Sequence, residues 1–365
     1  MRACKRAIRI LRVGLYLLTA TALSPAGAVE PPTEPPADWG PTAIDYSNVP
    51  YPYPVAYLEL SLFGDVQRMA YMDVQPGGPA NGRTVALFHG MNFFAAAYRP
   101  TIDALAAAGF RVLAIDRLGY GRSSKPLVHY NLHMPARNTK ALLDHLGIER
   151  AAIVGHSMGG MVATRFAATY PDATSHLVMV NQIGLTDVRQ SRPWSDPEEL
   201  YRRVLATDYE SVLAGHRRYY PRGWQPEYLE WVRVQYGLTL GGDWPRMARV
   251  RAAQMQILYE DPVVYEWQHI ATKALVIGGA DDRLSADYPA EARHVAESLQ
   301  NAELVLFPGV GHAPAFEIPE QFHAELIRFL RSDPDTRASQ AWRRSNESRG
   351  QQGSTQRPVP PESGM

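Results

Sequence analysis

The sequence predicts an α/β fold with a mostly parallel eight-stranded sheet that is flanked by helices. Three observations support this prediction: short apolar segments that end in Gly, Asp, Asn or Pro, segments of helical spacing that alternate with them, and one long interval of helical segments without a strand. Short apolar segments are typical of strands buried on both faces, and their alternation with helices indicates right-handed crossovers between parallel strands. The sheet is therefore expected to carry a separate helical insertion.

Length and composition are those of a soluble globular protein. The chain has 365 residues, of which 45% are hydrophobic and 20% are charged, so it can bury a sizeable core and is neither wholly disordered nor fibrous. Lys and Arg number 37, as do Asp and Glu, and this balance gives no indication of a nucleic-acid partner. The single cysteine, Cys4, excludes a disulfide framework and a cysteine-rich metal site.

The first 28 residues are predicted to be a secretory signal peptide. Five basic residues and no acidic one precede an apolar segment at 13–23, and Ala26-Gly27-Ala28 follows with small residues at the spacing of a cleavage site. This apolar segment is shorter than the roughly 20 residues needed to span a bilayer as a helix. We therefore expect cleavage after Ala28 and a periplasmic or secreted protein without stable membrane insertion. The mature chain would be acidic and would lack cysteine.

Two further segments flank the predicted α/β core. Residues 29–55 are rich in proline, with 8 prolines between positions 31 and 54. Proline fixes φ and cannot donate a backbone hydrogen bond, so this segment is predicted to be an extended arm. Residues 331–365 are polar, with few apolar residues to bury, and are predicted to be a disordered tail.

Residues 56–184 and 271–330 are predicted to form the α/β core. Its eight strands are predicted at 56–62, 66–74, 84–89, 111–116, 151–155, 176–181, 273–278 and 302–307. Segments of helical spacing occur at 98–108, 133–146, 158–169, 288–299 and 319–330. The first two strands alternate well enough to form a pair, and the later ones are predicted to be buried on both faces.

Residues 185–270 interrupt the alternation after the sixth strand and are predicted to form a helical cap. They contain 13 of the 36 aromatic residues, among them five of the seven tryptophans. The five are Trp194, Trp224, Trp231, Trp244 and Trp267. Such amphipathic rings can form the core of a small helical unit, or they can line a substrate pocket. We favour a lid whose Trp and Tyr residues contribute to the pocket.

A predicted strand, the segment Gly155-His156-Ser157-Met158-Gly159 and a predicted helix follow one another directly. Gly-x-Ser-x-Gly in this context is the nucleophile elbow, a strained turn that presents a serine hydroxyl above a sheet. The glycines leave room where backbone segments crowd the turn, and the N-terminus of the following helix favours negative charge. We therefore predict that Ser157 is a catalytic nucleophile.

Other motifs accompany the elbow. Two of them end predicted strands: residues 88–92 (FHGMN), and residues 116–124 (DRLGYGRSS), which continue as a glycine-rich loop. Two more lie further along the chain: residues 278–283 (GGADDR) follow a third predicted strand, and residues 308–314 (PGVGHAP) precede the last predicted helix. With these motifs in this order, the chain resembles the α/β-hydrolase superfamily, in its capped serine esterase-like branch, from about residue 56 to residue 330. The resemblance implies the α/β-hydrolase fold, with the cap inserted after the sixth strand.

The resemblance also implies an oxyanion hole made of two backbone N–H groups. In the family, one belongs to the residue after the His-Gly pair, here Met91, and the other to the residue after the nucleophile, here Met158. The side chain of His89 is interpreted as structural, because the backbone performs the proposed work. The loop at 116–124 is interpreted as the floor of the site, and its serines as turn residues.

An acid and a base complete the implied site. The carboxylates of Asp281 and Asp282 compete for the role of acid, and the family spacing, with Asp before a basic residue, favours Asp282; Asp287 is a more distant alternative. His312, in a loop between a strand end and a helix, matches the general base of the family. Ser157, Asp282 and His312 then follow the Ser…Asp…His order of this fold.

The chemistry of such a triad needs no metal and no organic cofactor. His312 would take the proton of the Ser157 hydroxyl and return it to the leaving group, while Asp282 orients the imidazole and stabilises its protonated form. His129 and His133 are four residues apart but lack a nearby carboxylate pattern, so they are interpreted as non-ligands.

Together these features predict an exported serine hydrolase that cleaves a small-molecule carboxylic ester or lactone through an acyl-enzyme. The alternatives are a carbon–carbon bond hydrolase, a proline iminopeptidase-like peptidase of the same fold, and a non-catalytic ligand-binding α/β-hydrolase, against which the complete triad argues. Epoxide hydrolases and haloalkane dehalogenases use an Asp nucleophile, which Ser157 argues against. A perhydrolase activity could accompany any of these sites. The sequence leaves the physiological substrate, the acyl preference and the oligomeric state open.

Overall fold

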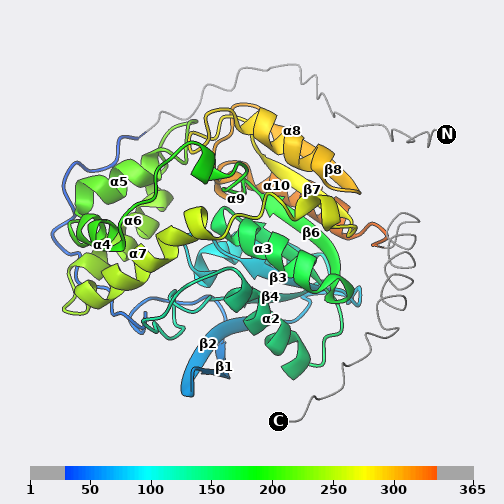
Figure 1. Ribbon diagram of the computed structural model, residues 1–365, viewed down its shortest axis with the longest axis horizontal. Helices are drawn as coiled ribbons and strands as arrows, with labels where there is room; N and C mark the ends of the chain where they lie inside the picture. The colour runs from blue at the N-terminus through cyan, green and yellow to red at the C-terminus, as the bar shows by residue number, and fades with distance from the viewer. Residues whose placement is uncertain (1–28, 335–365) are drawn as a thin grey trace, which may run out of the picture.

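The eight predicted strands are present and form one sheet in the order β1-β2-β4-β3-β5-β6-β7-β8 (Figure 1). The computed structural model describes residues 29–334, so the predicted signal peptide and the tail from residue 335 lie outside the described residues. The strands are β1 (Val55–Leu62), β2 (Asp65–Val74), β3 (Thr84–Phe88), β4 (Arg111–Ile115), β5 (Ala151–His156), β6 (Thr174–Val180), β7 (Ala274–Gly279) and β8 (Ala302–Phe307). Their bounds differ from the predicted ones by at most two residues.

The sheet is antiparallel at its first edge and parallel elsewhere. β2 pairs antiparallel with β1 and with β4, and all strands from β4 to β8 run parallel. Phe63 and Gly64 join β1 to β2 with φ values of 52° and 88°. Positive φ at both positions is typical of the tight turns that suit a two-residue hairpin. The mostly parallel sheet predicted from the alternation of strands and helices is therefore confirmed.

Burial differs between the centre and the edges of the sheet. Every residue of β5 and of β7 is buried, as expected for strands covered on both faces. The same prediction for β8 was wrong, because all six of its residues are only half-buried. β8 is the last strand in the sheet order and has a neighbour on one side only, so its apolar side chains are less completely covered.

Helices cover both faces of the sheet. α2 (His133–His145), α3 (Met158–Thr169) and α8 (Tyr288–Ser298) lie on one face, in front of the sheet in Figure 1. α1 (Arg99–Ala107) and α10 (Pro319–Leu330) pack together on the other. Each of these five helices lies within one residue of a segment predicted from helical spacing. The two faces hold separate hydrophobic clusters, so the sheet divides the core into two layers.

A further group of helices lies in the chain between β6 and β7, and gathers beside the sheet at the left of Figure 1. Its α-helices are α4 (Pro197–Leu205), α5 (Tyr209–Arg217), α6 (Leu229–Thr239) and α7 (Trp244–Glu260). The carboxylates of Asp196 and Asp208 accept hydrogen bonds from the first backbone N–H groups of α4 and α5, which fixes where these helices begin. Residues 185–270 are called the cap below.

The proline-rich arm joins the cap to the core. Residues 29–54 contain no helix or strand and run along the outside of the cap, in blue in Figure 1. The ring of Trp39 packs edge-on against Tyr209 of α5, with 6.0 Å between ring centroids. Further along, the Tyr51 hydroxyl donates a 2.6 Å hydrogen bond to the carboxylate of Asp116, just after β4. The arm therefore contacts both parts of the molecule.

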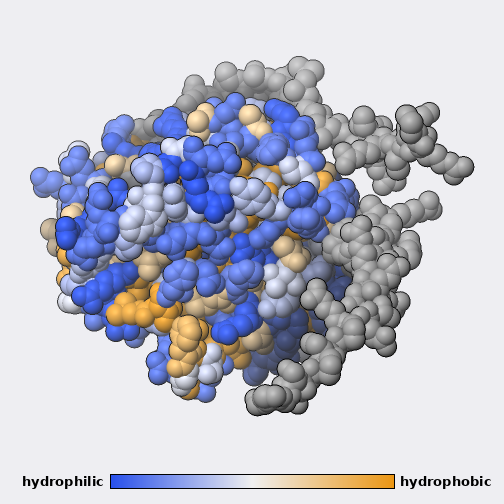
Figure 2. Space-filling view, viewed as in Figure 1, coloured by the Kyte–Doolittle hydropathy of each residue, from blue (hydrophilic) through white to orange (hydrophobic). Residues whose placement is uncertain are grey.

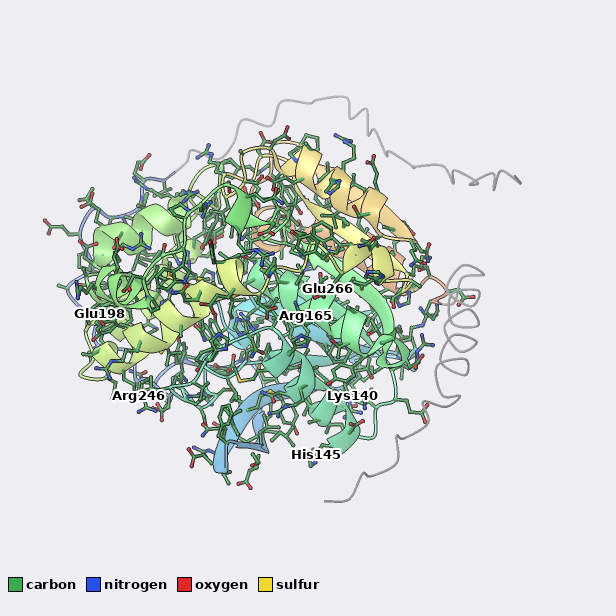
Figure 3. All side chains as sticks on the ribbon, in the orientation of Figure 1. Lys140, His145, Arg165, Glu198, Arg246 and Glu266 are labelled. Atoms are coloured by element: carbon green, nitrogen blue, oxygen red, sulfur yellow. The ribbon has the colours of Figure 1, made fainter. Side chains whose placement is uncertain are left out.

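A buried cation holds the end of the cap against the core. Arg165 of α3 has a side chain that is 6% exposed, and it forms ion pairs of 2.8 Å with Asp261 and 2.6 Å with Glu266. Both carboxylates belong to the segment that follows α7, and Figure 3 shows Arg165 and Glu266 close together. Since α3 begins directly after Ser157, this contact ties the last part of the cap to the helix that follows the elbow.

The surface drawn in Figure 2 is predominantly hydrophilic, with a small hydrophobic patch at its lower left. Among residues 29–334, no helix combines the length and the apolar character needed to cross a membrane.

Candidate active site

Ser157 occupies a strained turn between β5 and α3. Its φ of 56° and ψ of −124° lie outside the regions that residues with a side chain normally adopt. Its backbone N–H donates a 2.9 Å hydrogen bond to the carbonyl of Val180, at the end of β6, which holds the turn to the sheet. The residue is 6% exposed, because the loop after β3 lies against it. The local geometry is that of the predicted elbow.

The glycines of the elbow are required by close packing. A Cβ on Gly155 would overlap the carbonyl oxygen of Gly159, and a Cβ on Gly159 would overlap the carbonyl oxygen of Phe88 at the end of β3. Neither overlap can be relieved by turning a side chain, because both partners are backbone atoms. The sequence pattern Gly-x-Ser-x-Gly thus allows the elbow to press against the neighbouring strand.

The loop after β3, which contains Met91, lies against the elbow. The backbone at Gly90 passes so close that a Cβ there would lie 3.1 Å from the Cβ of Ser157. Residues 90–93 form a turn in which the N–H of Phe93 points to the carbonyl of Gly90 at 3.4 Å. Met158 is the first residue of α3, where backbone N–H groups lack partners within the helix. The residue before Met91 therefore lies against Ser157, and Met158 directly follows Ser157 in the chain.

His312 and Asp282 lie together in the buried part of the site. The Nδ1 atom of His312 is 2.6 Å from Oδ2 of Asp282, and both side chains are almost fully inaccessible. Because Nδ1 is engaged by the carboxylate, Nε2 is the ring nitrogen that remains for proton transfer. Asp282 follows β7 and His312 follows β8, so parallel neighbouring strands bring the pair to one edge of the sheet.

The two alternative acids point elsewhere. Asp281 is exposed, and its Oδ2 accepts a 2.6 Å hydrogen bond from the N–H of Gly309. Asp287 begins α8, where its Oδ1 accepts a 3.0 Å hydrogen bond from the N–H of Ala290. Of the three carboxylates considered, the structure places only Asp282 at His312.

Asp282 is held ionised by its neighbours. Burial by itself raises the pKa of this carboxyl, but the opposing effects of His312, the Leu284 N–H and the Asn181 side chain keep the pKa below its ordinary value. The amide of Asn181 donates to Oδ2 at 2.9 Å, and the Leu284 N–H donates to Oδ1 at 2.9 Å. The ionised form is the one that can orient an imidazole and stabilise its positive charge.

Asn181 is a contributor that the sequence analysis did not identify. Its Oδ1 also accepts a 2.9 Å hydrogen bond from the N–H of Gly279, so it links the end of β6 to the end of β7. The sequence offered one signal for this role: an asparagine directly after a predicted buried strand, next to the strand that carries the acid. Its role depends on the pairing of β6 with β7, which the sequence does not specify.

His156, inside the elbow motif, also has a role that was not predicted. Its Nε2 lies 2.8 Å from the carbonyl oxygen of His312, and its Nδ1 lies 2.6 Å from the hydroxyl of Tyr98. Because a carbonyl only accepts, Nε2 carries the proton and Nδ1 accepts from Tyr98. Burial lowers the pKa of His156 to about 3, so the ring is neutral. The residue before the nucleophile thus supports the backbone of the base.

The residues interpreted as structural are in structural positions. The Nδ1 atom of His89 lies 2.8 Å from the carbonyl of Gly90, and its Nε2 accepts from the N–H of Arg117. Ser123 donates to the carbonyl of Asp116 at 2.6 Å, within the glycine-rich loop. These side chains shape the loops around the site.

The five cap tryptophans differ widely in position. Trp231 packs against Phe93, Phe94 and Phe316, close to the loop after β3. Trp194 is 51% exposed and Trp267 is 1% exposed. The remaining two, Trp224 and Trp244, are also buried. Trp231 is thus the tryptophan for which the structure gives contacts next to the site.

The cap residue with direct contacts to the base is a tyrosine. The ring of Tyr219 packs against His312 with 5.1 Å between centroids, and its carbonyl accepts a 2.9 Å hydrogen bond from the N–H of His312. Tyr219 follows α5, so the cap reaches the candidate triad directly.

Among residues 29–334, no group of three or more His, Cys, Asp or Glu side chains has a metal-binding arrangement. His129 is paired with Glu260 at 2.9 Å, and His133 begins α2.

Comparison with known proteins assigns the family. The family described as alpha/beta hydrolase fold matches residues 83–214, which include β3 to β6, the elbow and α5 up to residue 214. A protein of Caulobacter sp. (strain K31), named as a candidate carbamate hydrolase RutD, is 31% identical over 269 residues, which cover 70% of this chain and 93% of that protein. The chain belongs to the α/β-hydrolase family.

Two further proteins are similar over most of their length. A 2-hydroxy-6-oxononadienedioate/2-hydroxy-6-oxononatrienedioate hydrolase of Paraburkholderia phymatum is 30% identical, over 75% of this chain and 94% of its own. The crystal structure of a candidate hydrolytic enzyme from Pseudomonas aeruginosa PAO1 superposes with a TM-score of 0.78 at 37% identity, over 80% of this chain and 99% of that one. The protein is therefore a hydrolase of this fold, as its sequence motifs predicted.

Proposed function

We propose that this hydrolase cleaves a carboxylic ester or lactone by a Ser157–His312–Asp282 mechanism. The observation that carries the proposal is the buried 2.6 Å contact between His312 Nδ1 and Asp282 Oδ2. His156, which directly precedes the elbow serine at its positive φ, contacts the backbone of the same histidine. A histidine held by a carboxylate in this way has its Nε2 available as general base, and the elbow serine is the nucleophile that such a base activates.

The proposed reaction has two acyl-transfer steps. In the first, the Ser157 oxygen attacks the ester carbonyl carbon, its proton passes to His312 Nε2, and the bond to the alcohol breaks as the alcohol takes that proton. In the second, water attacks the acyl-enzyme by the same proton transfers and releases the acid and free Ser157. The backbone N–H groups of Met91 and Met158 stabilise the oxyanion in both steps.

The activities named for the relatives are compatible with chemistry at a carbonyl group. A carbamate contains a carbonyl carbon, and the name of the Paraburkholderia relative specifies an oxo compound. For this chain, a ketone substrate attacked by the same serine is therefore an alternative to an ester. A peptide or a merely bound ligand has no comparable support.

We also propose that the protein acts outside the cytoplasm. The support is the basic, apolar and small-residue order of positions 1–28, which is that of a cleavable signal peptide. Fractionation of cells that express the full chain, with N-terminal sequencing of the product, tests this: a mature N-terminus at Val29 in the exported fraction is expected, and an uncleaved cytoplasmic protein would contradict it.

The catalytic proposal is tested on the purified mature chain with p-nitrophenyl esters of increasing acyl length and with a fluorophosphonate probe. Wild type is expected to turn over at least one ester and to be labelled stoichiometrically. Ser157→Ala is expected to do neither while keeping its circular dichroism spectrum, since the hydroxyl contributes little to packing. Full labelling of Ser157→Ala would refute the assignment, and a labelled enzyme that is inactive on esters but active on a ketone substrate would favour the alternative.

A further inference from the structure

A chain of hydrogen bonds runs from the cap to the loop that carries Met91. The guanidinium of Arg251, on α7, donates from Nη2 to Oδ1 of Asn92 at 2.6 Å. The amide of Asn92 donates from Nδ2 to the hydroxyl oxygen of Tyr219 at 2.7 Å. Asn92 therefore lies between two cap residues, although it belongs to the loop after β3.

The direction of these bonds follows from the groups themselves. A guanidinium only donates, so the Asn92 atom facing Arg251 must be the amide oxygen. The amide nitrogen then faces Tyr219, whose oxygen accepts. Among the described residues Arg251 forms no ion pair with a carboxylate. Its guanidinium instead donates to the neutral amide oxygen of Asn92. Both hydrogen-bonding ends of the Asn92 side chain are thus engaged by the cap.

The position of Asn92 gives this contact its consequence. Asn92 directly follows Met91 in the turn formed by residues 90–93. The peptide group that carries the Met91 N–H also carries the carbonyl of Gly90, to which the N–H of Phe93 points at 3.4 Å. Holding the side chain of Asn92, between Met91 and Phe93, therefore restricts the turn that orients this peptide group. The N–H of Met91 must point at the oxyanion within a narrow range of directions, because hydrogen bonds weaken steeply as they bend.

The same tyrosine contacts the base. The carbonyl of Tyr219 accepts from the N–H of His312 at 2.9 Å, and the two rings lie 5.1 Å apart. Phe93, the last residue of the turn, has its ring 5.9 Å from that of Tyr219. One segment of the cap therefore touches the oxyanion loop through its side chain and the base through its backbone.

We infer that Arg251 and Tyr219 are positioning residues, which hold Asn92, and with it the Met91 N–H, in register with His312. The inference rests on the proposed function, because it assigns a consequence to the oxyanion hole of that mechanism. Under this inference the cap assembles the site as well as covering it: without the Arg251–Asn92–Tyr219 contact, the nucleophile and base remain in place while the oxyanion donor is misdirected.

The test uses Arg251→Met and Asn92→Ala in the mature enzyme, assayed with a neutral p-nitrophenyl ester. Each variant is expected to lose kcat by about 10- to 100-fold, the scale of a small misplacement at a reacting centre, with KM changed by no more than about twofold. A boronic acid that forms a tetrahedral adduct with the serine should bind correspondingly more weakly. The double variant should lose no more than the worse single variant, because both remove one contact.

Arg249→Met is the matched control. Arg249 is an exposed arginine two residues earlier on α7, over the ring of Tyr201, and its loss should leave kcat unchanged. If Arg251→Met does not fold, Tyr219→Phe replaces it in the test. This variant deletes only the hydroxyl that contacts Asn92, and the same loss of kcat is expected. Arg251→Lys, which can still donate one hydrogen bond, should recover part of the loss.

Two results would overturn the inference. If wild type turns over esters and the variants keep its kcat and its affinity for the boronic acid, the contact is merely structural. If Arg251→Met instead raises KM only for esters that carry a carboxylate, Arg251 binds a substrate anion and does not position the loop. Failure of wild type itself to turn over or be labelled would refute the proposed function, which is a separate outcome.

Discussion

The Nε2–H of His156 donates a 2.8 Å hydrogen bond to the backbone carbonyl of His312. The two imidazole rings lie 4.8 Å apart, so the residue before the candidate nucleophile packs on the candidate base. On the opposite side, the His312 N–H is held by the carbonyl of Tyr219. The backbone of the base is therefore fixed from the core by one hydrogen bond and from the cap by another.

Asp282→Asn is expected to lower kcat by roughly 10⁴-fold, because an amide in place of the triad carboxylate favours the wrong tautomer of the histidine it contacts. Asp281→Asn should stay within a few-fold of wild type, since its carboxylate faces the N–H of Gly309. Steady-state kinetics on one ester compares them. Equal losses in the two variants would contradict the assignment of the acid.

Trp231→Ala is expected to change the ratio of kcat/KM between short and long acyl esters, because its ring packs against Phe93 beside the site. Trp267→Ala should instead leave that ratio unchanged and lower stability by about 3–5 kcal/mol, since this ring is fully buried. Trp194→Ala, at an exposed position, should change neither. A panel of p-nitrophenyl esters and thermal unfolding distinguish these effects, and an unchanged ratio in Trp231→Ala would assign that ring to packing alone.

Trp39→Ala is expected to loosen the cap while the core stays intact. The ring of Trp39 contacts Tyr209 of α5 and Tyr236 of α6, and aromatic pairs of this kind contribute about 0.5–1.5 kcal/mol each. Amide hydrogen exchange should therefore accelerate in α5 and α6 and remain slow in α3. Uniform acceleration across all helices would mean that the arm stabilises the whole fold and has no specific effect on the cap.

Arg165→Met is expected to destabilise the protein by about 3 kcal/mol, because it leaves the carboxylates of Asp261 and Glu266 without their buried cation. Arg202→Met removes an exposed i,i+4 pair with Glu198 and should cost less than about 0.5 kcal/mol. Urea unfolding measures both. Similar midpoints for the two variants would show that the Arg165 ion pairs add nothing beyond a surface contact.

The folded protein is expected to lose stability as the pH falls from about 6.5 to about 4. Burial lowers the pKa of His156 to about 3 and that of His176, His216 and His323 to about 4, from 6.5. The unfolded chain takes up these protons below pH 6.5 and the folded chain does not, so unfolding is favoured in this window. Glu317 has the opposite effect. Burial raises its pKa to about 7, so the folded chain takes up this one proton at a higher pH than the unfolded chain does.

Urea midpoints at several pH values test this expectation. His216→Gln keeps a donor for Gln235 but removes one titrating ring, so its stability should depend less steeply on pH than that of wild type. A midpoint that stays constant between pH 6.5 and 4.5 in wild type would contradict the assignment of these histidines as neutral in the fold.

The sequence by itself was sufficient to predict the strands of the sheet and the turn at Ser157. Periodicity and turn residues depend on local sterics and on which faces are buried, so the strands were predicted to within two residues. The pattern around Ser157 was readable for the same reason: Gly155 and Gly159 avoid clashes with backbone atoms, and no other residue can. The half-buried edge strand β8 was predicted to be buried on both faces, because its composition does not reveal that it has one neighbour.

Only the tertiary structure decided which groups meet. Asp281 and Asp282 are adjacent in sequence and chemically identical, and they differ because successive side chains leave the end of β7 in different directions, one toward Gly309 and one toward His312. Asn92, Tyr219 and Arg251 are up to 159 residues apart, so no local pattern could associate them. Contacts of this kind depend on how the cap packs against the loop after β3, which is set by the folded chain as a whole and not by any one segment.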